Sequence, residues 1–224
     1  MTLVGGWGVQ CRLRLARRPI RATADLDVLI PLALRPARVA LKAAAIGQTD
    51  PAHPCRLTGL DVDVDLLADD PDHLASPGFD TLVDDDGLCL LVPPFADALT
   101  LNAEEFELRP ELKEDEEPDE GVIVILPRAG ALFAAKVGNF SLESRAPEKR
   151  AIDGQDALAL LEAFGPLALD QDLVDLLPAR RARLADMVNE VGYGGLAAQA
   201  RISGASFPGA QDALPVLVRA LGRP

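Results

Sequence analysis

Apolar and polar side chains alternate with a period of two through much of the first two thirds of the chain. The alternation is regular over residues 9–15 and again over 24–28, where Asp25 and Asp27 separate apolar neighbours. A period of two is typical of a strand with one buried face. We therefore expect strands at 9–15 and 23–30, joined as a β-hairpin through the turn-like segment 17–19.

The same pattern continues beyond this hairpin. Further extended segments are expected over residues 39–46, 60–66, 121–126 and 131–137. Apolar runs at 82–83 and 88–92 flank Asp84, Asp85, Asp86 and Gly87, residue types that suit a tight turn, so a second hairpin is expected there. Residues 99–108 fit either a strand or a helix.

After Asp153 the apolar period changes to 3.6, which predicts amphipathic helices. Asp153 is expected to cap the first helix, and Gly165-Pro166 to end it. A left-handed Gly192 is expected to close the third helix, and Pro215 to lie in the first turn of the last. The four helices are expected over 153–164, 169–177, a segment containing 184–191, and 212–221.

These elements predict the α+β fold class, with an antiparallel β-sandwich or partly closed barrel followed by a C-terminal bundle of short helices. We expect a β-rich domain at 1–145 and a helical domain or appendage at 150–224. The segment 111–120 has almost nothing apolar to bury, and is expected to be an exposed acidic loop.

Charge is segregated along the 224-residue chain. Residues 1–42 carry a net charge of +6, residues 50–120 carry −19, and residues 121–224 are neutral, which gives the total of −13. An acidic surface repels nucleic acid, so nucleic-acid binding is the less favoured role. Segregated opposite charges favour self-association or docking with a protein partner.

Composition indicates a bacterial-type cytoplasmic protein. Arginine greatly outnumbers lysine and aromatic residues make up 4%. Cys11, Cys55 and Cys89 form an odd, widely spaced set, which favours buried free thiols in a reducing compartment. We find neither an export signal nor an apolar run long enough to span a membrane.

Three alternating aspartates, Asp61, Asp63 and Asp65, are the candidate metal ligands. Carboxylates on one strand face recur about 7 Å apart and can share a cation. The segment does not match an EF-hand loop, whose sixth position must be glycine, because Leu66 stands there. The alternative is a charged edge strand that resists aggregation.

Basic side chains near the N-terminus are the candidate partner-binding residues. In the expected hairpin, Arg12 and Arg14 pair with Asp25 and Asp27 across the strands. The full candidate set is Arg12, Arg14, Arg17, Arg18 and Arg21.

Familiar catalytic and cofactor motifs are weak or missing. The glycine pattern at 192–197 follows an amphipathic helix, whereas a dinucleotide-binding loop follows a buried strand. The two histidines, His53 and His73, stand in apparent loops beside prolines, and neither a nucleophile elbow nor a phosphate-binding lysine loop occurs. No catalytic residue and no cofactor is assigned.

The favoured function is a non-enzymatic protein-interaction, structural or assembly protein of a cytoplasmic complex. One alternative is a carboxylate- or metal-dependent enzyme using Asp61, Asp63 and Asp65. The other is an accessory nucleic-acid-associated protein that binds through the basic N-terminal hairpin.

Overall fold

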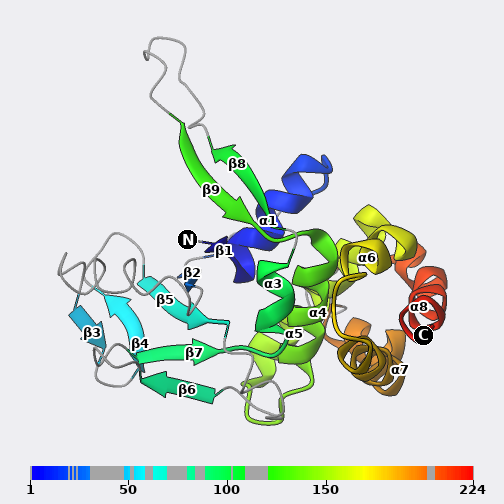
Figure 1. Ribbon diagram of the computed structural model, residues 1–224. Coiled ribbons are helices and arrows are strands. Elements are labelled where there is room, and N and C mark those ends of the chain that lie inside the picture. Colours follow the sequence, from blue (N-terminus) through cyan, green and yellow to red (C-terminus); the bar gives the residue numbers. More distant parts are fainter. Residues whose placement is uncertain are drawn as a thin grey trace.

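The computed structural model describes residues 2–19, 21, 23, 25–30, 48–50, 53–58, 63–69, 80–83, 89–101, 103–108, 121–200 and 205–223. The expected strand at 39–46, the turn at 84–87 and the acidic loop at 111–120 lie outside these residues, as does Asp61. The described residues form a mixed α+β structure in which helices gather on one side of a sheet (Figure 1).

Nine strands pair into one sheet among the described residues. Their bounds are β1 Thr2–Leu3, β2 Asp25–Ile30, β3 Gln48–Asp50, β4 His53–Thr58, β5 Asp63–Ala68, β6 Asp80–Val83, β7 Cys89–Val92, β8 Glu104–Leu108 and β9 Val122–Leu126. The order is β3-β4-β5-β2-β1-β9-β8, and β7 pairs with both β5 and β6.

The sheet is mixed rather than antiparallel, which corrects the expectation of an antiparallel sandwich or barrel. β2 runs parallel to β5, β1 to β9 and β5 to β7, whereas the other pairs are antiparallel. Within the described residues no pairing joins β3 to β8, so the sheet does not close. Its second layer is made of helices, as Figure 1 shows.

The helices begin near the N-terminus and dominate the last third. Their bounds are α1 Gly5–Leu15, α3 Ala96–Thr100, α4 Ala129–Phe140, α5 Pro147–Phe164, α6 Pro166–Asp172, α7 Pro178–Ala200 and α8 Pro208–Leu221. α4 and α5 pack closely together, and α7 and α8 pack against each other and against α5.

Two segments predicted as strands are helices. In α1, Val9 and Leu13 are buried one turn apart, while Leu15 is exposed, so the apparent period of two concealed a helical i, i+4 pair. In α4 almost every side chain is buried, so the segment 131–137 has no polar face to reveal its period. The expected hairpin of 9–15 with 23–30 is therefore wrong.

The predicted strand at 60–66 corresponds to β5, the segment 121–126 to β9, and the second hairpin to β6 and β7, in which Val83 pairs with Cys89. Residues 99–108 divide between the end of α3 and β8.

The C-terminal helices are confirmed, with different boundaries. α5 begins at Pro147, so Asp153 is a buried interior residue rather than a cap. α6, Pro166–Asp172, overlaps the expected segment 169–177 but begins and ends earlier. Gly192 has the expected positive φ, 60°, and kinks α7. Pro215 lies in the middle of α8 rather than in its first turn.

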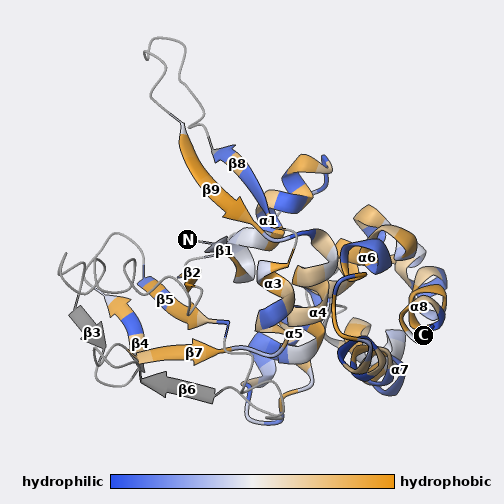
Figure 2. Ribbon diagram, in the orientation of Figure 1, coloured by the Kyte–Doolittle hydropathy of each residue, from blue (hydrophilic) through white to orange (hydrophobic). Residues whose placement is uncertain are grey.

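One hydrophobic core joins the sheet to the helices. It contains strand residues such as Leu29 and Leu66 together with Phe133 of α4, Leu158 of α5 and Leu217 of α8. Figure 2 shows hydrophobic residues concentrated in β5, β7 and β9. The N-terminal ends of β2 and β5 are polar, and the candidate site forms at these ends.

Candidate functional site

Carboxylates from two neighbouring strands converge at one end of the sheet. Asp25 and Asp27 are alternate residues of β2, so they point to the same face. The parallel register sets Asp63 beside Asp25 and Asp65 beside Asp27. Asp25, Asp27 and Asp65 line a common pocket.

The N-terminus of α1 approaches this carboxylate group closely. The Val4 N–H donates to the Asp27 backbone carbonyl at 3.0 Å, and the Gly6 N–H lies 3.4 Å from Asp27 Oδ2. Gly5 has a φ of +57°, and a Cβ atom there would lie 1.8 Å from Asp27 Oδ2. Glycine therefore permits both the backbone conformation and the close approach of Asp27.

Asp27 is a partly buried carboxylate with an unfavourable charge environment. Among the described residues, no ion pair to it is found, although Lys136 is near enough to interact electrostatically. Burial raises the pKa of Asp27 to about 6, and the neighbouring Asp25 and Asp65 act in the same direction. Lys136 and the Gly6 N–H only partly offset these effects.

Arg56 on β4 faces the carboxylates from the other side of β5. It pairs in register with Asp65 and binds it with two hydrogen bonds, Nε to Oδ1 at 2.6 Å and Nη2 to Oδ2 at 2.7 Å. Its nitrogens also lie 3.7 Å from Asp25 Oδ2 and 3.6 Å from Asp63 Oδ2. Hydrogen bonding to Asp65 raises the pKa of Arg56, so the guanidinium stays charged.

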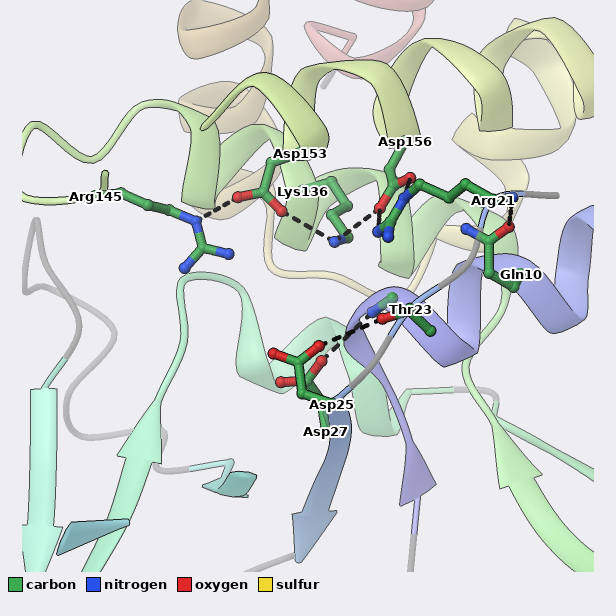
Figure 3. Close-up of polar contacts among 10 residues, drawn as sticks. Gln10, Arg21, Thr23, Asp25, Asp27, Lys136, Arg145, Asp153 and Asp156 are labelled. Atoms are coloured by element: carbon green, nitrogen blue, oxygen red, sulfur yellow. Dashed lines mark hydrogen bonds and ion pairs between the residues drawn. The ribbon is translucent and has the colours of Figure 1, made fainter. Parts of the chain in front are cut away.

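A second, buried group of charges lies across the pocket (Figure 3). Lys136 of α4 is 5% exposed, and its Nζ is 2.9 Å from both Asp153 Oδ1 and Asp156 Oδ2 of α5. Arg21 binds Asp156 through Nε at 2.9 Å and Nη2 at 2.8 Å, and Arg145 binds Asp153 through Nε. We call these five residues the buried ion network.

Opposite charges within the buried ion network favour the charged forms of Lys136 and Asp156. Although burial opposes a charged ammonium, Asp156 and Asp153 keep the pKa of Lys136 above its ordinary value. Burial likewise opposes ionisation of Asp156, but Lys136 and Arg21 bring its pKa below the ordinary value. The network contains three cations and two carboxylates, so it leaves an excess positive charge beside the pocket.

The pocket between these two charged groups has a volume of about 550 Å³, within the range of small-molecule sites. One wall is lined by Lys136 of α4, Lys149 of α5, and Ser144 and Arg145 from the segment between these helices. Apolar side chains of the sheet and helices complete the wall: Val4, Leu67, Leu91, Pro93, Leu99 and Leu132.

Two of the predicted metal ligands lie at this site. Asp65 lines the pocket. Asp63 lies 3.6 Å from Arg56, which also lines the pocket, whereas Asp61 lies outside the described residues. The sequence reasoning missed Asp25 and Asp27 because it assigned them to ion pairs with Arg12 and Arg14. The signal that could have identified them is the pair Asp25 and Asp27 at the start of an apolar strand, which follows the helix that begins with Gly5 and Gly6.

The predicted partner-binding arginines do not form one patch. Arg12 binds Glu104 at 2.9 Å and the carbonyls of Leu126 and Pro127, so its predicted pairing with β2 is wrong. Arg14, Arg17 and Arg18 are exposed at the end of α1, and Arg21 belongs to the buried ion network. Partner binding through these residues stays a prediction.

Within the residues that the structure describes, no group of three or more His, Cys, Asp or Glu side chains could hold a metal ion. In the same residues, no helix combines the length and apolar character needed to cross a membrane.

Comparison with known proteins gives no further assignment. No family model matches the sequence, and neither a curated protein nor a solved structure matches it. The proposed function therefore rests on the geometry of the pocket.

We expect Gly5→Ala to destabilise the protein by about 2–4 kcal/mol, because the new Cβ would collide with Asp27 and the backbone would be strained. Urea unfolding followed by circular dichroism measures the change. Gly194→Ala is the matched control, since its Cβ would meet no atom within 4 Å. Equal stability of the two variants would contradict the close approach of Asp27 to α1.

We expect Asp27→Asn to stabilise the metal-free protein by about 1–2 kcal/mol at pH 7.5. The raised pKa means that the folded state retains a proton which the unfolded state has lost between about pH 4 and pH 6. Asp27 therefore reduces stability as pH rises through this window, and the gain in the variant should disappear near pH 4.

Thermal unfolding in a chelator at pH 4 and pH 7.5 measures this difference. Asp186→Asn, on the exposed face of α7, is the control and should behave like the parent protein at both pH values. A gain for Asp27→Asn that does not depend on pH would be inconsistent with an ionised, strained Asp27.

We expect Lys136→Met to cost about 3 kcal/mol, because it leaves two buried carboxylates with one fewer cation. Lys149→Met removes an exposed lysine of the same pocket and should change stability by less than about 0.5 kcal/mol. Chemical denaturation compares the two variants. A loss below about 1 kcal/mol for Lys136→Met would show that Arg21 and Arg145 alone neutralise the carboxylates.

Proposed function

We propose that this protein is a divalent-cation-dependent enzyme that transfers a nucleotidyl group from a nucleoside triphosphate. The observation that carries the proposal is the convergence of Asp25, Asp27 and Asp65 in one pocket at the N-terminus of α1. It develops the carboxylate- or metal-dependent alternative derived from the sequence, with Asp65 retained and β2 supplying the other carboxylates.

The carboxylate group supports cation binding. Three like charges at one pocket repel one another, and Asp27 lacks a compensating ion pair among the described residues. Mg²⁺ needs only one or two protein carboxylates, because waters and substrate phosphates complete its octahedron. A closed protein-only metal centre is therefore not required.

The opposite wall supports phosphate binding. Lys136, Arg145 and Lys149 bring positive charge to the pocket, and Arg21 adds to it from the β2 side. The N–H groups at the start of α1 lie beside the carboxylates, and a helix N-terminus favours an anion. A pocket with several cations on one wall and metal-binding carboxylates on the other suits a polyphosphate chain better than a single phosphate.

The arrangement suits displacement at phosphorus. Cations held by Asp25, Asp27 and Asp65 would stabilise charge on the attacking and leaving oxygens. With the outer phosphates against Lys149, the α-phosphorus would be the group nearest the carboxylates. An acceptor hydroxyl forms the new P–O bond, pyrophosphate leaves with the bonding electron pair, and the hydroxyl proton passes to a base. The apolar wall is available to the nucleoside.

The test combines ligand stabilisation with isotope transfer. We expect ATP, GTP, CTP or UTP together with Mn²⁺ to raise the Tm more than either component alone, by an amount equivalent to about 2.7 kcal/mol at 100 times Kd. Asp25→Asn and Asp65→Asn should lose this gain. Glu104→Gln, which disrupts an ion pair on β8, should retain it.

The isotope position distinguishes the reactions. Label from an α-³²P nucleotide should appear on an acceptor in a mixture of RNA and protein substrates, with unlabelled pyrophosphate released. Transfer of γ-³²P instead would indicate a kinase-type reaction. If no nucleotide stabilises the protein with Mn²⁺ and neither label is transferred, the proposed function is wrong.

Protein interaction or assembly is a second proposal. It is supported by exposed apolar side chains at two places, Val122 (62%) and Ile123 (69%) on β9 and Leu167 (70%) on α6. Figure 1 shows β8 and β9 projecting from the body of the sheet, where a partner could reach them. Exposed apolar side chains on such a projecting hairpin suit contact with a partner, and such a role is compatible with an enzymatic pocket.

A further inference from the structure

The ribbon of β8 and β9, which we call the arm, carries an apolar row beside an acidic row on one face. In the antiparallel register, Glu105 lies opposite Ile125 and Glu107 lies opposite Ile123. Opposite and alternate residues of such a pair point to the same face, so these four side chains share it. Both glutamates are exposed, and Ile123 is 69% exposed. We call this face the outer face of the arm, and Figure 2 shows hydrophobic β9 beside hydrophilic β8.

The opposite face of the arm is joined to the body of the protein. Glu104 on this face lies 2.9 Å from Arg12 of α1 and 3.2 Å from Arg128, and Leu126 is fully buried. The outer face has no comparable cover at Ile123. Because a two-stranded ribbon is only marginally stable in water by itself, contact with another surface would stabilise the arm.

The end of α1 carries the opposite charge beside an apolar side chain. Leu15, the last residue of α1, is 48% exposed, and the exposed Arg17 and Arg18 follow it. The N–H groups of Arg17 and Arg18 donate to the carbonyls of Arg14 and Leu13, each at 2.9 Å, so both arginines stay close to the helix. We call Leu15, Arg17 and Arg18 the basic end of α1.

We propose that a second copy of this chain covers the outer face of the arm with its own basic end of α1. Leu15 of one copy then packs against the partner's Ile123, and Arg17 and Arg18 lie against the carboxylates of the outer face. The inference rests on the second proposal, protein interaction, for which it supplies the partner, and it is independent of nucleotidyl transfer.

The two surfaces are placed so that one pair of copies can make this contact twice. Arg12 of α1 binds Glu104 of β8, so α1 lies against the base of the arm, and Figure 1 shows both projecting from the same side of the molecule. Two copies related by a two-fold axis would exchange arm and helix end, which closes the assembly as a dimer. Since each copy has a net charge of −13, docking depends on this local complementarity of charge.

Charge reversal on each surface tests the contact, with sedimentation velocity measured over a range of protein concentrations. The parent protein should form dimers. Arg17→Glu combined with Arg18→Glu brings like charges together twice in each dimer, and should weaken dimerisation by about tenfold or more. Glu105→Lys combined with Glu107→Lys should weaken it to a similar extent.

A mixture of the two double variants provides the decisive measurement. Each variant alone has like charges on its arm and its basic end of α1, but the mixed pair has opposite charges at both contacts. The mixture should therefore form a heterodimer with about the affinity of the parent protein. Formation of the heterodimer would also show that both variants are folded.

Substitutions on the two faces of β9 test the apolar part of the contact. Ile123→Thr should weaken dimerisation by about tenfold, because it removes apolar surface twice in each dimer. Val122→Thr is the matched control, since Val122 is 62% exposed on the opposite face and both substitutions keep a β-branched side chain. Asp186→Lys combined with Glu190→Lys, at exposed positions of α7, repeats the charge change of the arm variant. Both controls should dimerise like the parent protein.

The outcomes separate this contact from self-association in general. If the parent protein stays monomeric at every concentration, self-association is wrong and this inference with it. If the parent dimerises but the charge-reversed variants and Ile123→Thr dimerise equally well, protein interaction stands and its location on the arm is wrong. Failure of the mixed variants to associate, with circular dichroism showing both folded, would likewise overturn the contact between the arm and α1.

Discussion

The buried ion network is the constraint that fixes the helical part of this protein against its sheet. Lys136 joins α4 to α5 through Asp153 and Asp156, and Arg21 ties α5 to the segment that enters β2. Buried charges are costly unless every partner is in place. The relative positions of α4, α5 and the segment that enters β2, and therefore part of the pocket wall, depend on this one set of paired side chains.

The carboxylates across the pocket are not neutralised in the same way. Among the described residues, Arg56 is the cation that binds Asp65 closely, while Asp27 keeps a raised pKa and borders the α1 N-terminus. Sites that must bind a ligand commonly retain such unfavourable electrostatics, which the ligand then relieves. The buried ion network is thus satisfied within the protein, whereas the carboxylate group carries charge that a ligand would neutralise.

The sequence predicted β5, β9, the β6–β7 hairpin and the amphipathic C-terminal helices. α4 was missed because it is buried on all sides, and α1 because Val9 and Leu13 satisfy periods of both two and four. The parallel pairing of β2 with β5 depends on long-range packing, which local alternation does not encode.

The candidate site was partly predictable for the same reason. Asp65 could be found because it alternates with apolar neighbours, but its relation to Asp27 exists only through the β2–β5 register. Asp153 was expected to cap a helix and Asp156 was not singled out, and the burial of both becomes evident only with Lys136 opposite. A chain with a net charge of −13 can attract an anionic substrate only locally. Lys136 and its neighbours, together with cations held by the carboxylates, would provide that local reversal of charge.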